Sequence, residues 1–256
     1  MYEFKDTTIQ SCEEYKERPV SAMNFNGVFL EDLIEGYQTL SVDGREMINQ
    51  ELLTDNLKNG TRISSKRLPP RILTIKYKLV NNNPYELLND YRILMRYLIT
   101  DEEVDIVFND ELDVFYKGVY HSSETVPGDT TSIVSSFQIH CDNPFKQTVK
   151  TFNTDGYIGI DTHYDTYPLK ITCTVNSGKQ LKITNNKQTI ALRSNTIKSG
   201  DVIVFDFIKS KVFVNRKDST NYLELTSDFE YFKLYQGGKV ETNNGYLSIE
   251  YKGVTL

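Results

Sequence analysis

The clearest hydrophobic pattern lies between residues 71 and 99. Residues 71–79 (RILTIKYKL) alternate apolar and polar side chains, which predicts a strand with one buried face. After three asparagines, apolar side chains recur at three- and four-residue steps up to residue 98. Asn83 suits the capping position of a helix and Pro84 its first turn. The pattern predicts one amphipathic helix over residues 84–99.

Further strands are predicted on the carboxyl-terminal side of this helix. Residues 104–108 and 112–116 flank the polar residues 109–111, which predicts a hairpin with a short loop. A strand over residues 132–141 follows the turn at 126–129. The first half therefore combines strands with a single helix.

The second half has a different pattern, because no helical periodicity is found after about residue 150. Residues 169–175 alternate apolar and polar side chains, and turn-forming residues then recur at short intervals. About eight strands in about 100 residues predict a β-sandwich. We expect a mainly β chain of two domains, residues 1–150 and 151–256, with the seam near residues 146–154.

Composition is consistent with this and excludes several classes of protein. The 256 residues include 29 Lys and Arg against 35 Asp and Glu, a formal charge of −6 with a pI near 5.2. Specific nucleic-acid binding needs a basic face and is not expected. The first residues have neither a secretory signal nor a membrane span, so we expect no membrane insertion and folding in a reducing cytoplasm. The three cysteines, Cys12, Cys141 and Cys173, are odd in number and widely spaced, which argues against disulfides.

Candidate chemistry is sparse. Seven carboxylates occur between residues 101 and 113, but they fall at a helix end and in a hairpin loop, where solvated charge is expected. No glycine interrupts that run as a calcium loop requires, and no histidine pair has metal-ligand spacing. Serine-elbow and phosphate-loop motifs are absent, and Asn59-Gly60-Thr61 matches a glycosylation acceptor that matters only in a secreted protein. We therefore expect no catalytic residues, no cofactor and no metal.

Asp43-Gly44-Arg45 has two interpretations that the sequence leaves open. An Asp-Gly pair is common in plain β-turns. Alternatively, Arg45 and Arg71 offer bidentate forks that suit carboxylates in a subunit contact. Neither arginine is expected to be catalytic.

Several motifs in order resemble the siphophage distal tail protein family. They are the segments around Asp43-Gly44-Arg45 and Pro69-Pro70-Arg71, the acidic stretch 101–110, residues 137–146 and, in the second half, residues 200–206, 211–215 and 227–229. The family usually has glycine after the asparagine of a short hairpin, where this chain has Arg216.

The resemblance implies a specific architecture and role. It implies an α+β amino-terminal domain with one helix, which forms a homo-hexameric ring, and a galectin-like β-sandwich that projects as a docking surface. The ring is a structural hub at the distal end of the virion tail, assembled in the host cytoplasm. Its implied partners are the major tail tube protein, a tail-associated hub protein and a receptor-binding or baseplate protein.

Two further expectations accompany this interpretation. The alternative function is a carbohydrate-binding accessory module for host cell-surface sugars, with Tyr222, Tyr231, Phe232 or Tyr235 as stacking platforms in a chain without tryptophan. In a hexamer, DNA has to pass the channel without adhering to it, and an acidic wall achieves this. Asp110, Glu111 and Asp113 are therefore the candidate channel-lining residues; the competing interpretation is an outer, solvated loop.

Overall fold

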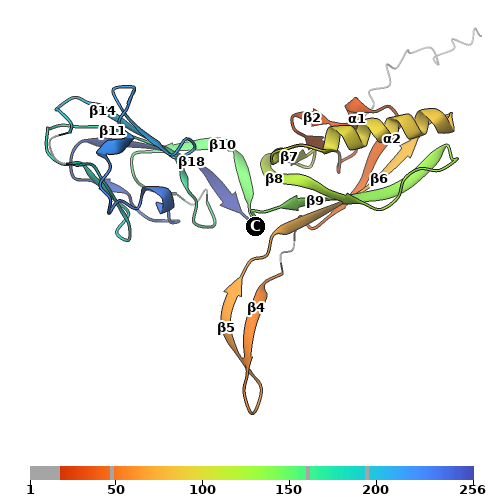
Figure 1. Ribbon diagram of the computed structural model, residues 1–256, viewed down its shortest axis with the longest axis horizontal. Coiled ribbons are helices and arrows are strands. Elements are labelled where there is room, and N and C mark those ends of the chain that lie inside the picture. Colours follow the sequence, from red (N-terminus) through yellow and green to blue (C-terminus); the bar gives the residue numbers. More distant parts are fainter. Residues whose placement is uncertain (1–17, 47–48, 160–161, 194–195) are drawn as a thin grey trace, which may run out of the picture.

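The structure, a computed structural model, describes residues 18–46, 49–159, 162–193 and 196–256, so that Cys12 lies outside it. Figure 1 shows two β-rich halves and a hairpin arm that projects from them. The elements of the first half are β1 (Met23–Phe25), β2 (Val28–Phe29), α1 (Leu30–Leu33), β3 (Tyr37–Asp43), β4 (Glu51–Asn56), β5 (Thr61–Arg67), β6 (Arg71–Val80), α2 (Pro84–Leu98), β7 (Val104–Phe108), β8 (Glu111–Ser123) and β9 (Ser132–Cys141).

The remaining elements are strands and two 3₁₀ turns. They are β10 (Lys146–Thr154), β11 (Pro168–Thr174), β12 (Lys182–Thr184), β13 (Thr189–Ala191), β14 (Val202–Asp206), β15 (Lys211–Val214), β16 (Lys217–Asp218), η1 (Thr220–Tyr222), η2 (Phe229–Tyr231), β17 (Glu241–Thr242) and β18 (Tyr246–Thr255). The expected mainly β fold is confirmed.

One antiparallel hydrogen-bonded network connects the two halves. In the first half, β8 pairs with β7 and β9, and β9 pairs with β6, which pairs with β3. In the second half, the strand order is β16-β15-β14-β11-β18-β10. The two halves join at β10, which pairs with β8 at its start and with β18 along its length. A second sheet, β13-β12-β17, completes the sandwich.

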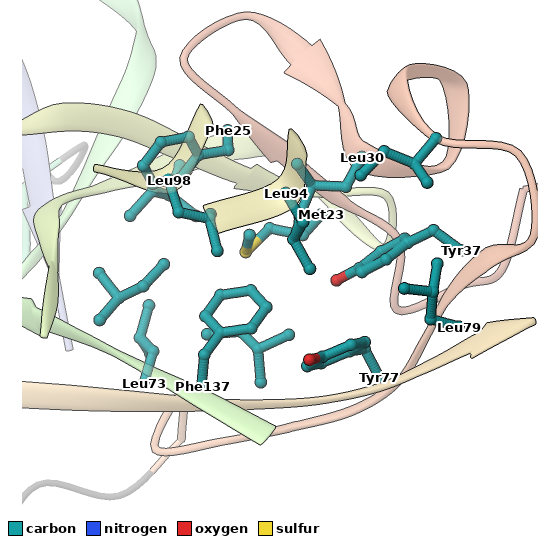
Figure 2. Packing of buried hydrophobic residues seen from close by; sticks show 14 of the residues in the cluster. Met23, Phe25, Leu30, Tyr37, Leu73, Tyr77, Leu79, Leu94, Leu98 and Phe137 are labelled. Carbon is teal, nitrogen blue, oxygen red and sulfur yellow. The ribbon is translucent and has the colours of Figure 1, made fainter. Parts of the chain in front are cut away.

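The core of the first half lies between α2 and the sheet. Asn83 caps α2 by accepting a hydrogen bond from the backbone N–H of Tyr85, 3.0 Å away, and Pro84 occupies the first turn. The buried face of the helix presents Leu94 and Leu98 to side chains from β1 and the sheet. Figure 2 shows Met23, Phe25, Leu73, Tyr77 and Phe137 in the same cluster.

The core of the second half is separate and lies between the two sheets of the sandwich. It collects alternate residues of β11, β14 and β18, with Ile183 of β12 and Ile190 of β13 from the facing sheet. Cys141 and Cys173 are buried and unpaired, one in each core. The two hydrophobic clusters are separate, but the seam near 146–154 falls on a strand that both halves share. The division into two domains therefore remains a prediction.

The predicted helix and the strands at 71–79, 104–108 and 132–141 are found with small shifts in their ends. The second strand of the predicted hairpin extends further, from Glu111 to Ser123, because its far end pairs with β9. The arm β4–β5 and the four-residue helix α1 were not predicted. Within the described residues, no helix has the length and apolar character needed to cross a membrane.

Candidate functional site

A cluster of charged side chains lies where the two halves join. It contains Arg45 after β3, Arg71 at the start of β6, Asp110 and Glu111 at the β7–β8 turn, and Lys146 at the start of β10. These segments are separated by up to 101 residues in sequence (146 − 45 = 101). Four of the five were expected as site residues, although as members of two different sites. We call these five residues the junction cluster.

Gly44 makes the turn that brings Arg45 into the junction cluster. Its φ is +93°, and a Cβ at this position would lie 2.1 Å from the carbonyl oxygen of Ile72. Only glycine fits this backbone. The turn also presents the carbonyl oxygens of Gly44 and Arg45 to the side chain of Arg71, whose Nη1 donates to both, with 2.8 Å to Gly44.

Arg71 is a buried arginine held mainly by backbone oxygens. It is 3% exposed, and its Nε donates to the carbonyl of Pro144 at 2.8 Å. Its guanidinium lies over the Tyr116 ring, 5.4 Å from the centroid. Burial lowers the pKa of Arg71, although an arginine stays protonated in proteins. Arg71 thereby ties the turn after β3 to the segment that enters β10.

Arg45 and Asp110 form a two-pronged ion pair. Arg45 Nη1 and Nη2 donate to the two carboxylate oxygens of Asp110 at 2.5 and 2.7 Å, and the guanidinium lies over the Phe108 ring at 4.8 Å. The Arg45 hydrogen bond lowers the pKa of Asp110, and the same bond raises the pKa of Arg45. Such paired, charge-assisted bonds are stronger than neutral ones.

Lys146 and Glu111 complete the cluster next to Tyr116. Lys146 is 4% exposed, and its Nζ lies 2.8 Å from Glu111 Oε1. The hydroxyl of Tyr116 donates to the other Glu111 oxygen at 3.1 Å. Burial is the main cause that raises the pKa of Tyr116 far above its ordinary value, and the negative charge of Glu111 is the second. A buried lysine needs such a partner, and here the pair fixes the first residue of the strand that leads into the second half.

The structure thus gives the predicted residues partners within their own chain. Asp110 occupies both terminal nitrogens of Arg45, and Glu111 neutralises Lys146. Backbone carbonyls accept from Nε and Nη1 of Arg71, whereas its buried Nη2 has no hydrogen-bond partner among the described residues. Asp113 differs, because it is exposed on β8. Roles of the two arginines in a subunit contact, and of the three carboxylates along a channel, remain predictions. Among the described residues there is no group of three or more metal-binding side chains.

The second candidate site is the arm formed by β4 and β5. These strands pair only with each other, and all their residues are exposed. Figure 1 shows the arm pointing away from both halves. It carries four apolar side chains that are 46–64% exposed, namely Leu52, Leu53, Leu57 and Ile63.

The sequence contains a signal for the arm within the segment that also matches a glycosylation acceptor. Asn59-Gly60 is a typical hairpin turn, and Gly60 has a φ of +86°. The backbone N–H of Leu57 donates to Gly60 at 3.0 Å across this turn. A two-stranded hairpin that packs on no other element is only marginally stable in water.

The aromatic residues expected as sugar platforms do not form one surface. Phe232 is 0% exposed and belongs to the core of the second half, whereas Tyr231 beside it is 68% exposed. Lys187 covers the Tyr235 ring at 4.0 Å. Phe232 as a stacking platform is therefore wrong, because its ring packs inside the sandwich.

Comparison with known proteins finds similarity to phage tail proteins. Residues 161–253 match the family model described as "Siphovirus-type tail component, C-terminal domain". No match is found among curated proteins. Among solved structures, the Dit (gp 19.1) protein of phage SPP1, described as a paradigm of hub adsorption apparatus in phages that infect Gram-positive bacteria, is 18% identical. Its TM-score is 0.77, and the alignment covers 93% of this chain and 100% of that one.

More distant similarity is found to the phage P2 baseplate in its activated conformation. The match to the form with Ca has 6% identity and a TM-score of 0.48, over 85% of this chain and 90% of the other. With so low an identity and TM-score, this match supports no conclusion about the present chain. The family model bears out the resemblance to siphophage tail proteins for residues 161–253, and SPP1 Dit shares the fold of nearly the whole chain.

Proposed function

We propose that this protein is a structural hub of a siphophage tail tip, in which six copies form a closed ring at the distal end of the tail. The ring joins the tail tube protein to a tail-associated hub protein and to receptor-binding or baseplate proteins. The protein is assembled in the host cytoplasm and resides in the virion. The similarity of the whole chain to SPP1 Dit, itself described as an adsorption hub, supports this proposal.

The observation that carries the ring is the exposed arm. Its apolar side chains and unpaired strand edges are a liability for a monomer and are removed from water if a neighbouring copy covers them. An arm that docks on a different surface of the next copy makes a head-to-tail contact, and such contacts close into rings when the rotation permits.

A groove of about 830 Å³ offers a complementary surface for the arm of a second copy. It is lined by Val107, Leu112 and Val149, and by the carboxylates of Glu102, Glu103 and Asp105. Leu112 and Val149 are 59% and 50% exposed. Residues 51–67 carry four Lys and Arg against two Asp and Glu, a charge of 4 − 2 = +2. Apolar contact together with opposite charge favours this pairing.

Native mass spectrometry of the purified chain tests the ring. We expect six copies for the wild type, and monomers for Leu53→Asp, because a carboxylate on the arm opposes its burial. Leu225→Asp is the matched control, since Leu225 is 97% exposed in the second half and should leave the ring intact. A wild type that is monomeric at tens of micromolar, or a control that dissociates equally, contradicts the proposal.

A further inference from the structure

The hairpin between β15 and β16 contains an arginine in a backbone conformation that favours glycine. Asn215 and Arg216 have φ values of +48° and +69°. Asn215 suits this position, because its side chain accepts from the N–H of Val202 at 3.0 Å and donates to Asp201 at 2.8 Å. The guanidinium of Arg216 has no hydrogen bond or ion pair with any residue that the structure describes. The two-residue hairpin requires a positive φ at both positions, which glycine adopts more easily than arginine. No side-chain contact of Arg216 offsets this cost, and strained positions concentrate at functional sites.

Arg216 lies at a groove of about 650 Å³ on the outer face of the larger sheet of the sandwich. Successive side chains of β11, β14, β15 and β18 point alternately into the core and toward this groove. Ile171, Ile203 and Val212 point into the core, while their neighbours face the groove. Val204 is paired with Phe213, and Lys170 with Glu250, across adjacent strands.

The groove combines an apolar floor with polar and charged walls. Phe213 and Val204 are half-buried and form the floor. Lys170 Nζ and Glu250 Oε2 lie 3.7 Å apart along one wall, and both side chains are nearly 40% exposed, so both can still bind a ligand. Arg216 contributes a cationic fork with no carboxylate partner.

This combination suits a saccharide that carries an acidic group. The C–H face of a sugar ring packs on an aromatic and aliphatic floor, and its hydroxyls pair with a carboxylate and an ammonium group. A guanidinium fork recognises a carboxylate or phosphate on the same ligand. We propose that this groove binds an acidic saccharide, with its ring over Phe213 and its anionic group on Arg216.

This site goes beyond the structural role proposed above, and it does not require the ring, because all of its residues belong to one chain. It also differs from the aromatic residues expected from the sequence. Because Arg216 has a positive φ and also supplies the cation of the proposed site, its replacement by glycine has opposite effects on stability and on affinity.

Calorimetric titration of the full chain with a hyaluronan tetrasaccharide, which carries carboxylates, tests the site. Chitotetraose is the neutral comparison. We expect binding of the acidic probe that weakens with salt, and at least tenfold weaker binding of the neutral one. Arg216→Gly should raise the melting temperature and weaken binding of the acidic probe at least tenfold, whereas Arg216→Lys should retain part of the affinity.

Asn186→Gly is the matched control, because Asn186 also has a positive φ, +68°, in a turn of the same half but outside the groove. It should leave the affinity unchanged. No binding of the acidic probe, equal binding of the neutral one, or undiminished binding by Arg216→Gly overturns the proposal. Light scattering on the same samples reports the ring separately, so failure of one proposal is distinct from failure of the other.

Discussion

At the scale of single residues, the junction cluster explains why Asp43-Gly44-Arg45 has these residues. Gly44 permits a close approach to Ile72, and this approach places two carbonyls in reach of Arg71. Arg45 then binds Asp110, which lies 65 residues further along the chain. Within one chain the turn anchors the segments around β10, and a role of Arg45 in a subunit contact remains a prediction.

Substitution of Gly44 tests this anchoring. Gly44→Ala places a Cβ against the Ile72 carbonyl and forces a positive φ on alanine, so we expect a loss of about 2–4 kcal/mol in the free energy of unfolding. Gly60→Ala is the control, because Gly60 has a similar φ of +86° but open space around it. It should cost about 1 kcal/mol or less in urea unfolding. Equal losses would show that backbone strain alone matters at Gly44.

The Arg45–Asp110 pair gives a pH dependence. The folded-state pKa of Asp110 lies below its unfolded value of about 4, so the pair stabilises the folded state above that pH. This contribution is lost as the pH falls through the folded-state pKa. Asp110→Asn should cost about 1 kcal/mol at pH 7 and flatten the acid limb of the stability curve. Asp113→Asn, at an exposed position on β8, should change neither quantity.

At the scale of elements, β10 has a double role. Its first residues pair with Val114 and Phe115 of β8, and residues 151–154 pair with β18. Phe152 also packs on Tyr251, with the ring centroids 5.7 Å apart. The strand that the sequence marks as a seam is therefore a structural member of the second half as well as its connection to the first.

Truncation tests the proposed domain boundary. A fragment of residues 146–256 keeps β10 and should unfold cooperatively. A fragment of residues 155–256 leaves β18 as an edge strand and uncovers Tyr251, so it should be less stable by about 1–3 kcal/mol. Thermal melts of both fragments measure this difference. If neither fragment melts cooperatively, the second half is not a separate domain.

At the scale of the whole molecule, the proposed ring has to pass DNA. Six copies of a chain with a formal charge of −6 carry −36. Asp110 and Glu111 are partly neutralised by Arg45 and Lys146, so Asp113 is the candidate whose charge is free to act in a channel. Its effect reaches only about 8 Å at physiological ionic strength.

Charge reversal tests the channel. In the assembled ring, Asp113→Lys would line the channel with cations and should retard duplex DNA in a gel, with an affinity that falls as salt rises. Asp129→Lys makes the same change of charge at an exposed position in the β8–β9 connection and serves as the control. If the two variants bind DNA equally, the channel placement of Asp113 is contradicted.

The sequence by itself determined the elements whose signals are local. Alternation defined β6, a preceding turn marked β9, and the period of α2 with its Asn-Pro start defined the helix. Ordered motifs indicated the family. Only the tertiary structure decided the rest. The junction cluster joins residues up to 101 positions apart, and which cation meets which carboxylate depends on strand register and burial. Asn59-Gly60 is a local signal for the turn of the arm, but the exposure of the arm and of the groove at Arg216 depends on what covers each surface, which only the tertiary structure shows.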